Sequence, residues 1–157
     1  GADSKSRVGE GHEPETHLIP NILKSTFADG KTFKLFGTDY QTKDGTCVRD
    51  YINVEDLAQA HLLALDYLNK GGKTDFFNLG TNDGCTNREV FSICERVTGK
   101  NITLEECSKR EGDPASLVAN NAKAKSILGW IPQKSLEYSI DKAYEWEKIL
   151  NGELLNA

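Results

Sequence analysis

The sequence predicts an α/β domain in which short strands and helices follow one another in mixed order. Three observations support this prediction. Apolar residues recur at helical spacing in several segments, and short runs rich in β-branched and aromatic residues lie between them. Glycines and helix-capping residues separate the two kinds of segment. With 157 residues, the chain is long enough for one compact domain with its own core.

The first third of the chain predicts a helix, a strand, a loop and a second strand. Residues 16–27 carry an apolar stripe at helical spacing, and Pro20 fits the first turn because its missing amide has no partner there. Residues 32–36 are a strand candidate, and the polar residues 37–46 predict a loop. Alternation of β-branched or aromatic residues with polar ones predicts a strand over residues 48–54.

The middle of the chain predicts a largely apolar helix. Asn53 is a typical cap, and the helix that it opens runs to about Leu68 with apolar residues over most of its surface. Such a helix is expected to be covered on more than one side. Residues 75–79 then predict a short buried strand that ends at Gly80.

A capping box opens the next predicted helix. Thr86 is followed three residues later by Glu89, and Gly99 marks the end of the helix. The remaining expected elements are a strand over residues 102–107, a helix over 122–128 and a last helix after Ser135.

Composition narrows the possible partners. Charged residues make up 27% of the chain and the net charge is −5, so a basic surface for nucleic acid is not expected. No apolar run approaches the roughly 20 residues that span a bilayer, so we expect no membrane partner and a cytoplasmic location. The chain has no methionine, and we interpret it as a piece excised from a longer protein.

Cysteines and histidines predict neither disulfides nor a metal site. The four cysteines form no CxxC pair, which favours free thiols in a reducing compartment. The three histidines, His12, His17 and His61, are too scattered in the sequence to predict a metal cluster.

Motifs for a self-sufficient catalytic centre are missing from this sequence. It contains no GxGxxG or GxxGxxG dinucleotide loop, no P-loop, no HExxH and no GxSxG. We therefore predict no catalytic residue and no cofactor-binding residue within the chain.

Two short segments combine arginine with carboxylates. They are GTCVRDY, residues 45–51, and KREGDP, residues 109–114. The arginine fork suits phosphate, and a carboxylate can accept hydrogen bonds from vicinal hydroxyls. On spacing alone, a simpler interpretation is favoured, in which Arg49–Asp50 and Arg110–Asp113 are surface ion pairs worth about 0–1 kcal/mol each.

Several strings shift this balance because they resemble one family in order and spacing. They are ETHLIP at 15–20, FGTDYQTKDGTCVRDYI at 36–52, VEDLAQAH at 54–61, FNLG at 77–80 and REGD at 110–113. Together they resemble the UDP-glucose 4-epimerases, which are extended short-chain dehydrogenase/reductases. The likeness covers nearly the whole chain, and the DGTCVRDYI segment is its most specific part.

The resemblance implies that residues 1–157 are the carboxy-terminal, UDP-sugar-binding part of such an enzyme, without its amino-terminal Rossmann core. That missing core would bind NAD and supply the catalytic tyrosine and lysine, so this chain alone is expected to be inactive. The full-length enzyme would be a homodimer that interconverts UDP-glucose and UDP-galactose in galactose metabolism. Residues 53–80 are expected to pack against the missing Rossmann domain.

The resemblance also implies roles for single residues. Arg49 and Arg110 would bind the diphosphate, and Asp113 would bind the ribose hydroxyls. The other expected substrate-binding residues are Lys34, Leu35 and Phe36 around the uracil, Tyr51 beside Arg49, and His17 and Leu18 at a helix start near the phosphates.

Leu117 is where the resemblance bears on the choice of sugar. The family often has tyrosine or cysteine at this position, and leucine neither donates a hydrogen bond nor fills the space of tyrosine. One alternative is therefore an epimerase that also accepts UDP-N-acetylglucosamine. Another is a stand-alone UDP-sugar-binding or interaction module without catalysis.

Overall fold

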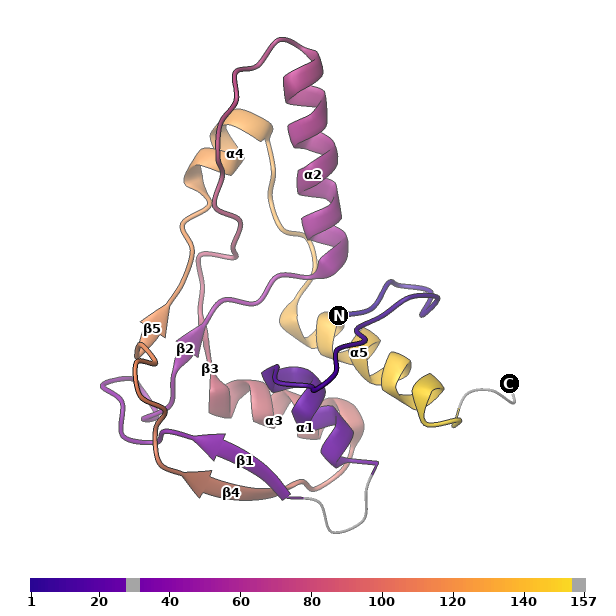
Figure 1. Cartoon of the computed structure of the whole chain (residues 1–157), viewed down its shortest axis with the longest axis vertical. Coiled ribbons are helices and arrows are strands. Elements are labelled where there is room, and N and C mark those ends of the chain that lie inside the picture. The colour runs from indigo at the N-terminus through magenta and orange to yellow at the C-terminus, as the bar shows by residue number, and fades with distance from the viewer. Residues whose placement is uncertain (28–31, 154–157) are drawn as a thin grey trace.

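The protein is described by a computed structural model over residues 1–27 and 32–153 (Figure 1). Its helices are α1 (Leu18–Ser25), α2 (Val54–Asn69), α3 (Asn87–Thr98), α4 (Ala122–Leu128) and α5 (Leu136–Leu150). Its strands are β1 (Thr32–Phe36), β2 (Val48–Arg49), β3 (Cys85–Thr86), β4 (Thr103–Cys107) and β5 (Ser116–Leu117). The predicted α/β class, with mixed short strands and helices, is confirmed.

Two regions are visible in Figure 1. In the lower one, α1, α3 and α5 lie beside the β1–β4 pair, and in the upper one α2 and α4 flank an extended segment. The main core fills the lower region, where apolar side chains of α1, β1, α3 and α5 meet. Full burial of each large side chain there, such as Ile22, Leu35 or Ile140, contributes roughly 1.5–3 kcal/mol.

The sheets are small but their registers fix the positions of the later site. β1 pairs with β4 in parallel, with Phe36 opposite Cys107. β2 lies between β3 and β5 in the second sheet and pairs antiparallel with β3 and parallel with β5. That parallel pairing places Leu117 opposite Arg49.

The predicted helix ends are confirmed by hydrogen bonds. The Thr86 hydroxyl accepts from the Glu89 amide at 3.1 Å, and the Glu89 carboxylate accepts from the Thr86 amide at 2.9 Å. Asn53 and Ser135 cap α2 and α5 through their side chains. Gly99 ends α3 in the left-handed conformation that glycine adopts without strain.

The position of Asp56, three residues after the Asn53 cap, suggests a variant of the capping box, but its side chain bonds to another segment. Its buried carboxylate accepts from the amides of Gln133 and Lys134 at 3.0 and 2.9 Å. Its backbone oxygen accepts from the Trp130 indole at 2.9 Å. Asp56 thus ties α2 to the segment between α4 and α5.

One predicted strand is shorter in the structure than expected, and another does not form. The strand expected over residues 48–54 is limited to β2, because the Asp50 carboxylate bonds to Thr81 and to the Ala119 amide and turns the chain away from a ladder. Residues 75–79 form no strand in the structure, although the described segment is extended in Figure 1. A strand needs a hydrogen-bonding neighbour, and none is paired with this segment within residues 1–27 and 32–153.

The predicted free thiols are confirmed, since all four cysteines are unbridged in the structure. Burial raises the pKa of Cys94 to about 12, which keeps this core thiol protonated at neutral pH. No helix among the described residues is long and apolar enough to cross a membrane.

Candidate functional site

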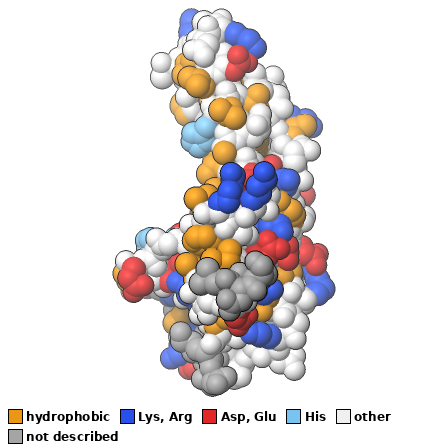
Figure 2. Space-filling view, turned by 90° about the vertical axis from the view of Figure 1, so that its right-hand side faces the viewer, with side chains coloured by type: hydrophobic (Ala, Val, Ile, Leu, Met, Phe, Trp, Pro, Cys, Tyr) orange, Lys and Arg blue, Asp and Glu red, His pale blue; other side chains and the backbone are white. Residues whose placement is uncertain are grey.

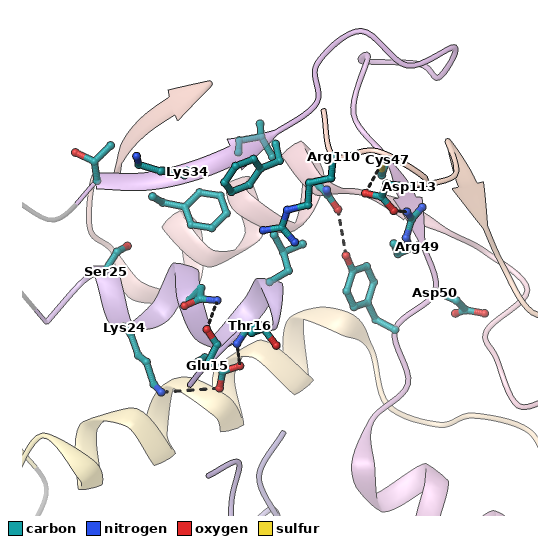
Figure 3. Close-up of a pocket in the computed structure, with 18 of the residues that line it drawn as sticks. Glu15, Thr16, Lys24, Ser25, Lys34, Cys47, Arg49, Asp50, Arg110 and Asp113 are labelled. Carbon is teal, nitrogen blue, oxygen red and sulfur yellow. Dashed lines mark hydrogen bonds and ion pairs between the residues drawn. The ribbon is translucent and has the colours of Figure 1, made fainter. Parts of the chain in front are cut away.

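A cleft of about 790 Å³ lies between α1, β1, β2 and the loop that follows β4 (Figure 3). Eight of the ten predicted substrate-binding residues line it: Leu18, Lys34, Leu35, Phe36, Arg49, Tyr51, Arg110 and Asp113. These residues come from separate segments of the sequence, between positions 18 and 113, and the fold brings them to one cleft.

The parallel β1–β4 pair brings Phe36 and Arg110 together. Phe36 ends β1, and Arg110 follows the end of β4 on the same edge. Ligands of open α/β sheets commonly bind where the carboxyl ends of parallel strands meet. The Arg110 guanidinium carbon lies 4.3 Å from the centre of the Phe36 ring, a cation–π contact that orients the side chain in the cleft.

Asp113 connects the two segments that were singled out in the sequence. Arg49 Nη2 donates to its carboxylate, and the Cys47 thiol donates to the same carboxylate at 3.5 Å. The Arg49 side chain is 21% exposed and that of Asp113 35% exposed. The ion pairs of the simpler interpretation, Arg49–Asp50 and Arg110–Asp113, are not formed, and Arg49 pairs with Asp113 instead.

Glycines close the loops that carry these residues. Gly45 has a φ of +81°, and a Cβ there would lie 2.2 Å from the Thr38 carbonyl oxygen. Gly112 has a φ of +77° in the turn between Arg110 and Asp113. Only glycine adopts this conformation readily, so both turns depend on it.

Apolar and aromatic residues also line the cleft, beside its charged groups. Tyr51 lies there, and burial raises its pKa, so the phenol stays protonated at neutral pH. Its hydroxyl donates to Asn87 at 3.4 Å. Leu35 is fully buried, so it offers the cleft its backbone, whereas the Lys34 side chain is largely exposed and lies 3.7 Å from Glu105.

Two predicted residues lie outside the cleft. His17 lines a neighbouring cavity of about 340 Å³ between α1 and α5. Leu117 does not line either cavity, and its side chain is 63% exposed on β5. Their expected roles toward a substrate remain predictions.

Sequence reasoning missed several polar residues in the cleft wall, namely Glu15, Thr16, Asn21, Lys24, Asp50 and Asn87. Glu15 is the best defined of them, because its Oε1 accepts from the amides of Thr16 and His17, each at 2.8 Å. Burial alone would raise the pKa of Glu15, but these bonds and the His17 ring outweigh it and lower the pKa. Lys24 follows Asn21 by three residues on α1. This spacing is the sequence signal that could have placed the two side chains on one face of the helix.

Four basic and four acidic residues line the cleft, so an anion would be held by local guanidinium groups and not by a net charge. Arg49 reaches the cleft from β2 and Arg110 from the loop after β4, while Lys24 and Lys34 lie at its other end (Figure 3). Asp113 supplies a hydrogen-bond acceptor between the two arginines. Planar guanidinium groups bind phosphate through paired charge-assisted bonds, and a carboxylate accepts from hydroxyls.

The prediction about scattered histidines is wrong for two of the three. His12 and His17 have ring centres 5.0 Å apart, and Glu15 lies beside them. A cis Glu13–Pro14 bond lies in the short segment between the two histidines. The positions of the histidines in the sequence did not reveal this cluster, because they do not show how the segment from His12 to His17 folds back on itself.

Comparisons with known proteins identify relatives of this chain. A family model described as the NAD dependent epimerase/dehydratase family matches residues 5–80. A UDP-glucose 4-epimerase from Halalkalibacterium halodurans is 48% identical over 149 residues, which are 94% of this chain and 45% of that protein. The chain thus spans less than half the length of the curated relative.

Solved structures give the same result. A crystal structure of a UDP-glucose 4-epimerase superposes with a TM-score of 0.92 at 43% identity, over 96% of this chain and 46% of that one. The UDP-glucose 4-epimerase from Bifidobacterium longum, in complex with NAD+ and UDP, has a TM-score of 0.85 at 31% identity, over 98% of this chain and 45% of its own. The chain therefore belongs to the NAD dependent epimerase/dehydratase family, and it corresponds to just under half of a UDP-glucose 4-epimerase.

Proposed function

We propose that this chain is the part of a UDP-glucose 4-epimerase that binds the UDP-sugar. The complete enzyme interconverts UDP-glucose and UDP-galactose with NAD as the redox cofactor. In this proposal, an amino-terminal part of the enzyme outside this chain binds NAD and carries the tyrosine–lysine pair. The residues of this chain hold the substrate.

The convergence of Arg49, Arg110 and Asp113 on one cleft is the observation that supports this proposal most. Arg49 and Arg110 would bind the diphosphate from two sides. Asp113 would then exchange its bond with Arg49 for bonds with the ribose hydroxyls. Phe36, at the end of β1, would offer its ring to the uracil, and the backbone of Lys34 and Leu35 would complete that end.

The exposed face of α2 supports a further element of the proposal, which is that residues 53–80 pack against the rest of the enzyme. Leu62, Leu65 and Leu68 are 62%, 57% and 50% exposed, and Phe76 is 82% exposed. Figure 2 shows hydrophobic side chains at several places along this side of the upper region. Large apolar patches commonly mark an interface, and the extended residues 75–79 would gain a neighbouring strand there.

Three further properties of the complete enzyme belong to the same proposal. We place its substrate turnover in galactose metabolism, its location in the cytoplasm, and its assembly as a homodimer through the part outside this chain. The net charge of −5 gives no generic basic surface for nucleic acid, which is consistent with a small-molecule partner.

Calorimetric titration of the chain tests the substrate-binding role. We expect UDP and UDP-glucose to bind and ADP to bind more weakly, because the end of the cleft at Phe36 and Leu35 would recognise uracil. Arg110→Ala is expected to weaken UDP binding by about 1–3 kcal/mol, the range for a charge-assisted bond. Equal affinity for UDP and ADP in both proteins would contradict the proposal.

A second candidate is an epimerase that also accepts UDP-N-acetylglucosamine. It is supported by Leu117, which pairs in register with Arg49 and leaves its side chain exposed beside the site. If this residue borders the sugar, Leu117→Tyr should reduce turnover of UDP-N-acetylglucosamine by the complete enzyme while turnover of UDP-glucose changes little. Negligible turnover of the N-acetylated sugar in both proteins would reject this candidate.

A further inference from the structure

We propose that His12, Glu15 and His17 form a binding site for one divalent cation of the zinc, cobalt and nickel class. Each residue offers one ligand atom, and the three atoms lie within 4.8 Å of one another. The site does not depend on the proposed binding of a nucleotide sugar.

The distance between Glu15 and His17 already suits a shared metal ion. His17 Nδ1 and Glu15 Oε1 are 2.8 Å apart. Two ligand atoms bound to the same Zn²⁺ at about 2.0–2.2 Å lie about 2.8–3.5 Å apart when the angle between them is about 90–110°. A cation can therefore replace the proton that these two atoms share.

His12 completes the set from the other side of the turn. Its ring centre is 5.0 Å from that of His17 in an edge-to-face arrangement, and both side chains are exposed. Rotation of an exposed imidazole is enough to shorten the remaining distances to a coordination sphere. Two imidazoles and a carboxylate are ligands that Zn²⁺ accepts, with water in the remaining position.

The backbone around the cluster is held in place without a metal. The Trp146 indole donates to the Glu10 carbonyl at 2.8 Å, which anchors the segment before His12 on α5. The amides of Thr16 and His17 both donate to Glu15 Oε1 and fix its orientation. Hydrogen bonds of this kind to a ligand carboxylate are typical of metal sites, because they orient the ligand before binding.

The charge on Glu15 also suits a cation. Its side chain is 6% exposed, and its Oε2 is buried without a hydrogen-bond partner. Lys24 Nζ lies 3.8 Å from Oε2, whereas the His17 ring faces the other carboxylate oxygen, Oε1. The cation would therefore bind at Oε1, where no lysine or arginine pairs with the carboxylate within the described residues.

Titration of the full 157-residue chain with Co²⁺ at pH 7.5, followed by visible absorption, tests the site. We expect weak d–d bands with one ion per chain, and displacement of Co²⁺ by Zn²⁺. His12→Ala should weaken Co²⁺ binding at least tenfold, and because this side chain is exposed, the substitution should leave the fold intact.

A matched variant and the spectrum separate this site from others. His61→Ala removes an exposed histidine of α2 and should leave Co²⁺ binding unchanged. An intense near-ultraviolet band would instead show cysteine thiolate as the ligand and overturn the proposal. Unchanged binding in His12→Ala, or equal losses in His12→Ala and His61→Ala, would overturn it as well.

Discussion

Arg49 and Asp113 form an ion pair that joins β2 to the loop after β4, across 64 residues of sequence. Both residues are predicted to bind the substrate, the first at the diphosphate and the second at the ribose. In the described structure each neutralises the other. A UDP-sugar would therefore have to separate the pair in order to bind both groups.

The first prediction follows from this competition. Asp113→Asn should strengthen binding of inorganic diphosphate by about two- to fivefold, because a partly exposed ion pair worth up to about 1 kcal/mol no longer holds Arg49. The same change should weaken binding of uridine, because an amide offers the ribose hydroxyls one neutral acceptor oxygen in place of two charged ones. Calorimetry with the two ligands measures both effects.

Asp39→Asn is the matched control for this experiment. Asp39 is an exposed carboxylate that pairs with Lys109 at 3.0 Å, outside the cleft wall. Its neutralisation changes the net charge equally and should affect both ligands little. If Asp39→Asn and Asp113→Asn strengthen diphosphate binding equally, the ion pair has no special role.

The second prediction separates phosphate binding by Arg110 from base binding by Phe36. Arg110→Ala should weaken inorganic diphosphate by about 1–3 kcal/mol and leave uridine nearly unchanged. Phe36→Ala should weaken uridine by about 1–3 kcal/mol, the cost of a lost base–aromatic stacking contact, and should weaken diphosphate less, because the Phe36 ring only orients Arg110. Calorimetric titrations of both variants with both ligands would contradict the assignment if the two changes had the same profile.

The third prediction concerns the exposed face of α2. The chain should bind an apolar fluorescent dye and self-associate, and the double substitution Leu62→Lys with Leu65→Lys should reduce both effects. Dye emission and analytical ultracentrifugation provide the measurements. Leu150→Lys is the control, because this leucine is 55% exposed at the end of α5 but lies away from α2.

The fourth prediction is a pH dependence of stability at Glu147. This carboxyl is 4% exposed on α5, and burial raises its pKa, while the charge of Lys24 opposes that effect in part. With the folded pKa above the unfolded one, the contribution of Glu147 to stability is fully present below the unfolded pKa. It is lost as the pH rises through the folded pKa.

Glu147→Gln should therefore raise the melting temperature by a few degrees at pH 7 and should have little effect near pH 4, where the wild-type carboxyl is protonated. Thermal unfolding followed by circular dichroism at the two pH values measures this. Glu153→Gln, at an exposed position after α5, should show no such difference between the two pH values. A gain at pH 4 as large as the gain at pH 7 would contradict the assignment to the buried carboxyl.

Local signals predicted those elements whose stability is local. The capping box of Thr86 and Glu89 and the left-handed Gly99 determine both ends of α3 within a few residues of sequence. The strand at residues 32–36 was predicted with the right bounds, because its apolar side chains alternate and its neighbours are polar. Non-local contacts, by contrast, decided where β2 ends, since Asp50 bonds to residues about 30 and 70 positions away.

The candidate site was predicted in part and for a similar reason. Family resemblance identified Arg49, Arg110 and Asp113, and the parallel register of β1 and β4 explains how Arg110 reaches the cleft beside Phe36. Neither composition nor spacing indicated that Arg49 would pair with Asp113, because that contact depends on the tertiary path of two loops. The His12–Glu15–His17 cluster lies within six residues of sequence, and it was missed because spacing does not reveal how the backbone turns there.

A crystal structure of the chain with bound UDP tests the central claim most directly. The account predicts that the phosphate oxygens contact the guanidinium groups of Arg49 and Arg110, with the Arg49–Asp113 pair broken and Asp113 bonded to the ribose hydroxyls. A structure with UDP bound outside this cleft, or with its phosphates away from both arginines, would contradict the account.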